Sequence, residues 1–116
     1  MLQLSPSMRI FVCMQSVDFR KGIDGLAAVC RNQLGQNPLD GALFVFRNQG
    51  RSSIRILVYD GQGFWLCTKR LSKGTFAWWP NTNDSQVDAK QLQTLLWNGN
   101  PSTAGFSRDW RKVLVQ

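Results

Sequence analysis

The forty residues from Gly41 to Pro80 constrain the fold most strongly, because strand-like runs alternate there with turns. The runs LFVF, IRILVY and GFWLCTKRL are rich in β-branched and aromatic residues, and RNQGRSS and the tight DGQG separate them. This pattern predicts an antiparallel meander. We expect a further short strand around Phe76 to Trp79, which Pro80 would end.

The short turn at Gly61 and Gln62 predicts the register of the last hairpin, in which Tyr59 pairs with Phe64. Alternation then gives one face that is mainly core, made by Ile54, Ile56, Val58, Trp65, Cys67 and Lys69. The other face is expected to be apolar near the turn and basic at the far end, beside the loop from Arg47 to Arg51. That face would carry Arg55, Leu57, Tyr59, Phe64, Leu66, Thr68 and Arg70.

An earlier strand and an amphipathic helix precede this meander. The run MRIFVCM predicts a short first strand in the same sheet, and VDFRKGIDGLAAVCRNQLG has apolar residues at helical spacing. Asp18 is the expected N-cap of the helix, and Gly35 the expected stop.

Gly22 and Gly25 are unusual within the first turns of such a helix, since each costs up to about 1 kcal/mol relative to Ala. One explanation is that the helix lies close to another backbone. The alternative is that it begins only after Gly22, so that DFRKG is a loop presenting Arg20 and Lys21.

The segment VDAKQLQTLLWNG predicts a second helix. Asp88 would be its N-cap with Gln91 at the third helical position, and Gly99 would end it. Trp97, at the end of this helix, is expected in the core.

These elements predict a single α+β domain over residues 1–99, with an antiparallel sheet of about four to five strands and two helices packed on it. A chain of 116 residues is long enough to bury such a core. Residues 100–116 form a tail of uncertain order. Its cations Arg108, Arg111 and Lys112 surround Trp110, and they form either a small basic hook or a poorly ordered end.

Composition favours a cytoplasmic protein without membrane contact. No apolar run approaches the length of a membrane span, and the start MLQLSPSMRIF lacks the features of a signal peptide. Cys13, Cys30 and Cys67 are isolated within apolar runs, which fits reduced core thiols better than zinc ligands or disulfides.

The charge of the chain indicates a polyanionic partner. The formal net charge is +7, and residues 41–80 carry six basic side chains against one acidic. Solubility alone is the competing explanation of this charge. If the partner is nucleic acid, the candidate contacts are Arg20, Lys21, Arg47, Arg51, Arg55, Lys69, Arg70 and Lys73.

The residue types present argue against catalysis. The chain has no His and no Glu, and no pair resembles a nucleophile with its base. Asp18, Asp24 and Asp60 could gather around a magnesium ion, but a helix cap, a solvated face and a turn explain them individually. We therefore expect no catalytic residue, no metal site and no cofactor.

Four stretches, VDFRKGIDGLAAV, GALFVFRN, IRILVYDGQGFWLCTKRLSKGTFAWWP and QLQTLLWNG, together resemble the TnpB-type accessory proteins of bacterial insertion sequences that carry a separate DDE transposase. These proteins are distinct from the RNA-guided nucleases that share the label. The similarity runs from about Arg9 to Gly99. Departures are Cys67-Thr68 before the KRL motif, the doubled Trp78-Trp79, and a longer tail.

The resemblance implies a noncatalytic protein needed for transposition, with DNA or the transposase as its partner. The leading hypothesis is an accessory protein that binds DNA at the element ends through a basic sheet surface. The alternative is an interaction module that binds the transposase or another accessory subunit without contacting DNA.

Overall fold

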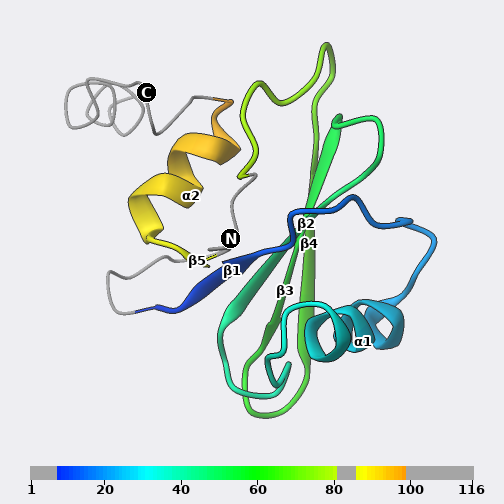
Figure 1. The fold of residues 1–116 in the computed structure, drawn as a ribbon, viewed down its shortest axis with the longest axis vertical. Coiled ribbons are helices and arrows are strands. Elements are labelled where there is room, and N and C mark those ends of the chain that lie inside the picture. Colours follow the sequence, from blue (N-terminus) through cyan, green and yellow to red (C-terminus); the bar gives the residue numbers. More distant parts are fainter. Residues whose placement is uncertain (1–7, 81–85, 99–116) are drawn as a thin grey trace.

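In the computed structural model, which describes residues 8–80 and 86–98, a five-stranded sheet lies between two helices (Figure 1). The strand order across the sheet is β4-β3-β2-β1-β5. This arrangement confirms the α+β class. The elements in chain order are β1 (Ile10–Val12), α1 (Ile23–Asn32), β2 (Leu43–Arg47), β3 (Ser53–Tyr59), β4 (Phe64–Arg70), β5 (Gln86–Val87) and α2 (Ala89–Leu96).

The sheet is mixed, which corrects the expectation of a purely antiparallel one. β1 joins the sheet as predicted, but it pairs parallel with β2, and Ile10 lies opposite Leu43. All other neighbouring strands are antiparallel. A parallel pair needs a crossover connection, and α1 supplies it.

The predicted register of the β3–β4 hairpin is confirmed from Tyr59 opposite Phe64 to Ser53 opposite Arg70. Asp60 stabilises the turn, because its Oδ1 accepts hydrogen bonds from the N–H groups of Gln62 and Gly63 at 2.9 Å. The hairpin register therefore follows from local chemistry.

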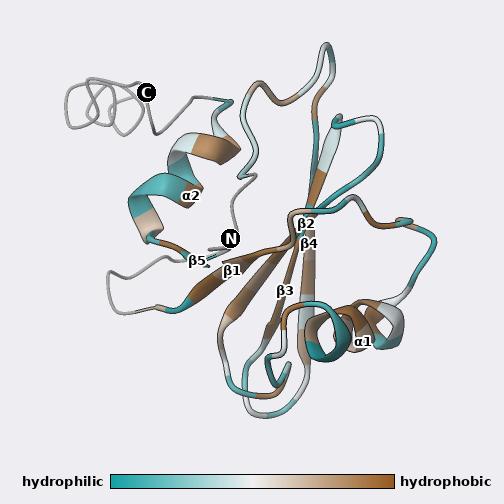
Figure 2. Ribbon diagram, in the orientation of Figure 1, coloured by the Kyte–Doolittle hydropathy of each residue, from teal (hydrophilic) through white to brown (hydrophobic). Residues whose placement is uncertain are grey.

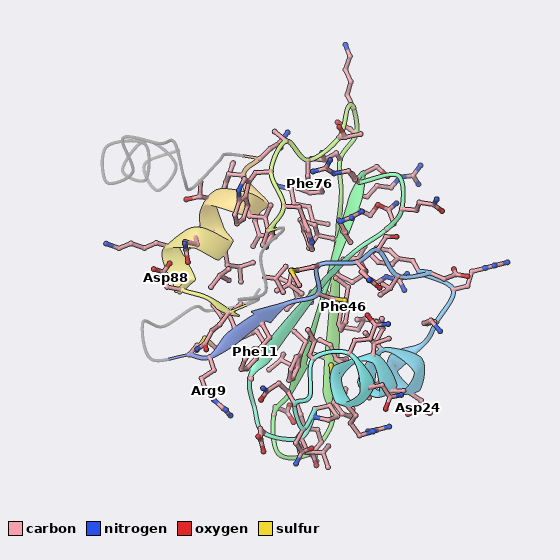
Figure 3. The ribbon with its side chains drawn as sticks, in the orientation of Figure 1. Arg9, Phe11, Asp24, Phe46, Phe76 and Asp88 are labelled. Carbon is pink, nitrogen blue, oxygen red and sulfur yellow. The ribbon has the colours of Figure 1, made fainter. Side chains whose placement is uncertain are left out.

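Each face of the sheet carries its own apolar core (Figure 2). The face covered by α1, which we call the α1 face, contains Phe11, Leu26, Cys30, Phe44, Phe46 and Leu57. The opposite, α2 face contains Ile10, Val45, Ile54, Phe76, Leu92 and Leu95. Figure 3 shows Phe46 and Phe76 on these two sides.

Helix α1 begins after Gly22, so DFRKG is a loop and Asp18 is not the N-cap. Asp18 instead binds Arg20 through both the backbone N–H and the guanidinium. Gly25 has a local explanation, because a Cβ added there would lie 2.9 Å from the Lys21 Cβ. The glycine lets the Lys21 side chain cross the first turn.

Helix α2 has the predicted capping box, in which Asp88 and Gln91 each accept from the backbone N–H of the other. The helix ends at Leu96, and Gly99 lies outside the described residues. The expected core position of Trp97 is wrong, since its side chain is 52% exposed.

The segment from Phe76 to Trp79 is not a strand, which corrects another prediction. The N–H groups of Leu71 and Phe76 donate to the carbonyls of Ser52 and Arg51, so the chain turns toward the β2–β3 loop. Phe76 and Trp79 are then buried in the α2-face core. The tail after residue 99 lies outside the described residues, and the domain boundary stays a prediction.

The three cysteines are free thiols, with Cys13 and Cys30 buried and Cys67 half-buried. Burial raises the pKa of the Cys30 thiol to about 12. Among residues 8–80 and 86–98, no helix has the length and apolarity needed to cross a bilayer.

Candidate functional site

The candidate cations gather at one end of the sheet, where β2 and β4 finish and β3 begins. Arg47 lies opposite Ile54, which in turn lies opposite Lys69, and Ser53 lies opposite Arg70. The loops 48–52 and 71–76 contact each other there through two backbone hydrogen bonds. We call this region, with the neighbouring loop 16–21, the basic end; the loops 48–52 and 71–76 are uppermost in Figure 1.

These cations do not share one face of the sheet, so the predicted basic sheet surface is wrong in that respect. Arg47 and Lys69 point to the α2 face, where they contact Trp79 and Trp97. Arg55 points to the α1 face, and Arg70 shares its side by alternation along β4. The shared location is an end of the sheet, with cations on both sides.

Arg55 fastens the loop before α1 to the sheet. Its NH1 donates to the Phe19 carbonyl at 2.6 Å, and its guanidinium carbon lies 4.6 Å from the centre of the Phe19 ring. Its Nε is buried without a hydrogen-bond partner. These contacts give Arg55 a structural role.

Arg47 and Lys69 are also held by internal contacts. The Arg47 guanidinium lies 5.8 Å from the Trp79 ring centre and donates to the Met14 carbonyl, and burial lowers its pKa. The Lys69 ammonium donates to the Leu96 carbonyl and lies 5.2 Å from the Trp97 ring centre. Both side chains connect the sheet to segments packed on the α2 face.

Arg51, Arg70 and Lys73 differ from these three, because their exposed side chains make no hydrogen bond, ion pair or ring contact with any described residue. Lys21 is likewise exposed without an ion pair in the described part of the chain. Arg20 is exposed, but Asp18 pairs with it at 2.8 Å. That pairing lowers the pKa of the Asp18 carboxyl to about 2.

A pocket of about 420 Å³ lies between the loop before α1 and the β2–β3 loop. Its lining residues are Ser16, Val17, Asp18, Phe19, Arg20, Asn48, Gln49 and Gly50. Asn48 shapes one wall, since its Oδ1 accepts the N–H groups of Ser52 and Ser53. Asn48 and Gln49 were not predicted as site residues, although they lie in the polar turn RNQGRSS that separates two of the predicted strands.

The aspartates considered for a magnesium site lie apart. Asp18 is at the basic end, whereas Asp60 is in the hairpin turn at the opposite end. The Gly63 and Gln62 N–H groups and the Trp65 indole hold the pKa of Asp60 below its usual value. Within the described ranges, no three residues of the metal-binding types form a group that could hold an ion.

Comparison with known proteins agrees with the motifs. The model of the family described as "IS66 Orf2 like protein" matches residues 8–103, so the chain belongs to this family of transposition accessory proteins. No solved structure matches.

Two proteins of Sinorhizobium fredii are similar to this chain. The uncharacterized protein y4jC is 40% identical over 113 residues, which cover 97% of this chain and 90% of y4jC. The uncharacterized protein y4hO is 41% identical over 78 residues, which cover 67% of this chain and 68% of y4hO.

Proposed function

We propose that this protein is a noncatalytic accessory factor for transposition of an IS66-type element, and that it binds DNA at the element ends through its basic end. Family membership supports the transposition role. The observation that carries DNA binding is the grouping of Arg70, at the end of β4, with Arg51 and Lys73 on the adjoining loops, without an acidic partner among the described residues.

The mechanism is phosphate neutralisation, which releases counterions from the DNA. The exposed cations Arg51, Arg70 and Lys73 provide the main contacts, and Lys21 and Arg20 extend the surface beside the pocket. Arg47, Arg55 and Lys69 contribute positive potential, while their internal contacts hold the loops in place. Asn48 and Gln49 place amide groups next to the same pocket, where a sugar or base edge could accept or donate a hydrogen bond.

A salt titration tests this proposal. Binding to labelled element-end duplex and to a scrambled duplex is measured by fluorescence anisotropy at increasing KCl. With about four phosphates engaged, the slope of log affinity against log salt should be near −3.6. An affinity that does not change with salt, or no binding even at low salt, would refute it.

The exposed tryptophans favour a second function, binding to the transposase or another accessory subunit. Trp65 and Trp97 are 60% and 52% exposed, and Trp is enriched at interface hot spots. Copurification with transposase after nuclease treatment, lost in W65A or W97A but kept in R70A, would favour this function. DNA binding by the chain alone with no copurification would argue against it.

A further inference from the structure

The two edges of the sheet differ in how they are protected. The β5 edge is two residues long, whereas the β4 edge presents seven residues in unbroken register with β3. Proteins protect sheet edges by shortness, proline, bulges or charge. β4 contains no proline, glycine or bulge, and its charges, Lys69 and Arg70, are at one end only. No strand of residues 8–80 and 86–98 pairs with its outer edge, which is therefore a template for another strand.

The ladder between β3 and β4 shows which backbone groups of β4 point outward. Backbone bonds from Asp60 to Gly63 and from Leu71 to Ser52 bracket the hairpin. Bonded and non-bonded pairs alternate between them. Trp65, Cys67 and Lys69 therefore bond to β3. The N–H and C=O groups that face the open edge are those of Phe64, Leu66, Thr68 and Arg70.

This outward set is symmetric about Cys67. We propose that β4 pairs antiparallel with β4 of a second copy of this chain, around a twofold axis at Cys67, so that two five-stranded sheets become continuous. In this register all seven residues overlap, with roughly eight backbone hydrogen bonds. If the pairing register of the two β4 strands shifts in either direction, residues at the strand ends lose their partners on the second copy. A twofold axis also makes the contact self-limiting.

When two copies of β4 pair antiparallel, the aromatic residues of each copy lie opposite the cations of the other. In the twofold register, Trp65 lies opposite Lys69 of the second copy, and Phe64 lies opposite Arg70 of the second copy. Each aromatic ring thus meets a cation across the strands, and such pairs attract. Trp65 is prepared for this contact, because it is 60% exposed while its indole N–H is held by Asp60 at 2.8 Å.

Trp97 adds to the same contact. The Lys69 ammonium already lies 5.2 Å from the Trp97 ring centre. Trp65 of the second copy would approach this ammonium from across the edge, so the cation would lie between two indole rings. This arrangement explains why two tryptophans are exposed on the α2 face.

Charge repulsion between the copies does not oppose the pairing strongly. In the twofold register, Lys69 of one copy and Lys69 of the second copy are offset by four residues along the strands. This offset corresponds to about 14 Å. This separation exceeds the Debye length of about 10 Å at 0.1 M salt. The attraction between each aromatic ring and the opposite cation acts over a short distance, whereas the repulsion between the two lysines is screened by salt.

The antiparallel arrangement would direct the two basic ends in opposite directions along the joined sheet. Each could then engage its own DNA segment, a consequence that rests on the proposed function. The pairing itself does not depend on DNA, so its test is done on nucleic-acid-free protein in 0.5 M KCl.

The first measurement is the mass of the full chain by sedimentation equilibrium. The expected mass is about 26 kDa, twice the 13.2 kDa of one chain. The disrupting variant is T68P, since the Thr68 side chain is exposed and its N–H is one of the outward groups. A proline there removes that donor without removing a bond to β3. T68A keeps the N–H and is the matched control. T68P should raise the dimer dissociation constant at least about tenfold, and T68A should not.

The second measurement uses the native Cys67. Opposed non-bonded positions place the two Cα atoms about 4.5 Å apart, within the range of a disulfide. Diamide oxidises two thiols to a disulfide and is itself reduced to the hydrazine. Oxidised wild type and T68A should give a disulfide-linked dimer on a nonreducing gel. C67S should give none, and T68P much less.

If T68P fails to fold by circular dichroism, W65K replaces it, because it places a lysine opposite Lys69 of the second copy. The double variant W65K/K69W restores the aromatic-to-cation order and should recover the dimer. A monomeric mass at 0.1 mM protein, or equal cross-linking in T68P and T68A, would overturn the proposal. Neither result would change the salt titration of DNA binding.

Discussion

The turns at the two ends of the sheet are stabilised by the same kind of hydrogen bond, but the accepting side chain is charged at one end and neutral at the other. At the hairpin end, the Asp60 carboxylate accepts two backbone N–H groups of its turn. At the basic end, the neutral Asn48 amide does the same for Ser52 and Ser53. Arg9 is paired with Asp40 at 3.6 Å at the hairpin end, whereas Arg51 has no such partner in the described chain.

This contrast shows how a modest net charge becomes a localised positive potential. The turn residue nearest to the cations of the basic end, Asn48, adds no carboxylate. The anion at Asp18 is already neutralised by Arg20. The basic end is therefore the region to which the proposed function assigns the phosphate contacts.

The largest expected effect is from removing the exposed cations. R51A/R70A/K73A should weaken DNA binding roughly a hundredfold at low salt, at about 1 kcal/mol for each phosphate contact. The salt slope should become less steep by about 2.7. The control R9A/R31A/K90A removes as many exposed cations from other positions. Equal losses in both variants, measured by anisotropy, would show that only net charge matters.

Arg55 and Arg70 lie on the same face of the sheet but should behave differently in unfolding experiments. R55A loses the hydrogen bond to the Phe19 carbonyl and the ring contact, and should lower the free energy of unfolding by about 1–3 kcal/mol. R70A removes an exposed side chain and should cost less than about 0.5 kcal/mol. Urea denaturation measures both. Similar values would contradict the distinction between structural and exposed cations.

Exchanging the turn residues tests the comparison of the two ends directly. N48D keeps an oxygen for the Ser52 and Ser53 N–H groups but adds a negative charge at the basic end. It should weaken DNA binding several-fold and reduce the salt slope by about 0.9. D60N removes a charge at the hairpin end and should leave binding nearly unchanged. An equal and opposite effect of D60N would mean that the DNA does not distinguish the two ends.

The smallest effect concerns Asp18. Pairing with Arg20 lowers the pKa of Asp18 from 3.8 to about 2, so the pair stabilises the folded state above about pH 4. This contribution is lost as pH falls through 2. The stability difference between wild type and D18N should therefore be present at pH 6 and shrink by pH 2.5.

D40N is the matched control for D18N, because Asp18 and Asp40 have similar side-chain exposure and each pairs with an arginine. At pH 7, D18N releases Arg20 at the basic end and should steepen the DNA salt slope. D40N releases Arg9 elsewhere and should not. The opposite ranking would place the DNA contact near Arg9.

Local patterns predicted the parts of the fold whose contacts are close in the chain. The Tyr59–Phe64 register follows from a short turn and side-chain alternation, and the cap at Asp88 from its spacing to Gln91. The parallel pairing of β1 with β2 was not predictable in this way, since the partners are about thirty residues apart. The prediction of a strand from Phe76 to Trp79 was wrong, because aromatic residues suit a strand and an irregular buried segment equally well.

The candidate site shows the same division. The sequence identified the cations and their concentration in the central third of the chain. Alternation within a strand could not show which of these cations would be bound by carbonyl groups and aromatic rings inside the protein. Phe19 and Trp79 are distant in sequence from Arg55 and Arg47, and they decide that these arginines serve the fold. Trp97 is exposed because α2 ends at Leu96, beside Lys69.

By itself, the sequence determined the strands from β1 to β4, the hairpin, the second helix and the family, because periodicity, turn chemistry and motif spacing act over short distances. Only the tertiary structure decided that α1 and α2 cover opposite faces of the sheet, and that internal carbonyls and rings hold Arg47, Arg55 and Lys69. That outcome depends on a parallel crossover and on loops that pack against each other, which are contacts between residues that no local pattern relates.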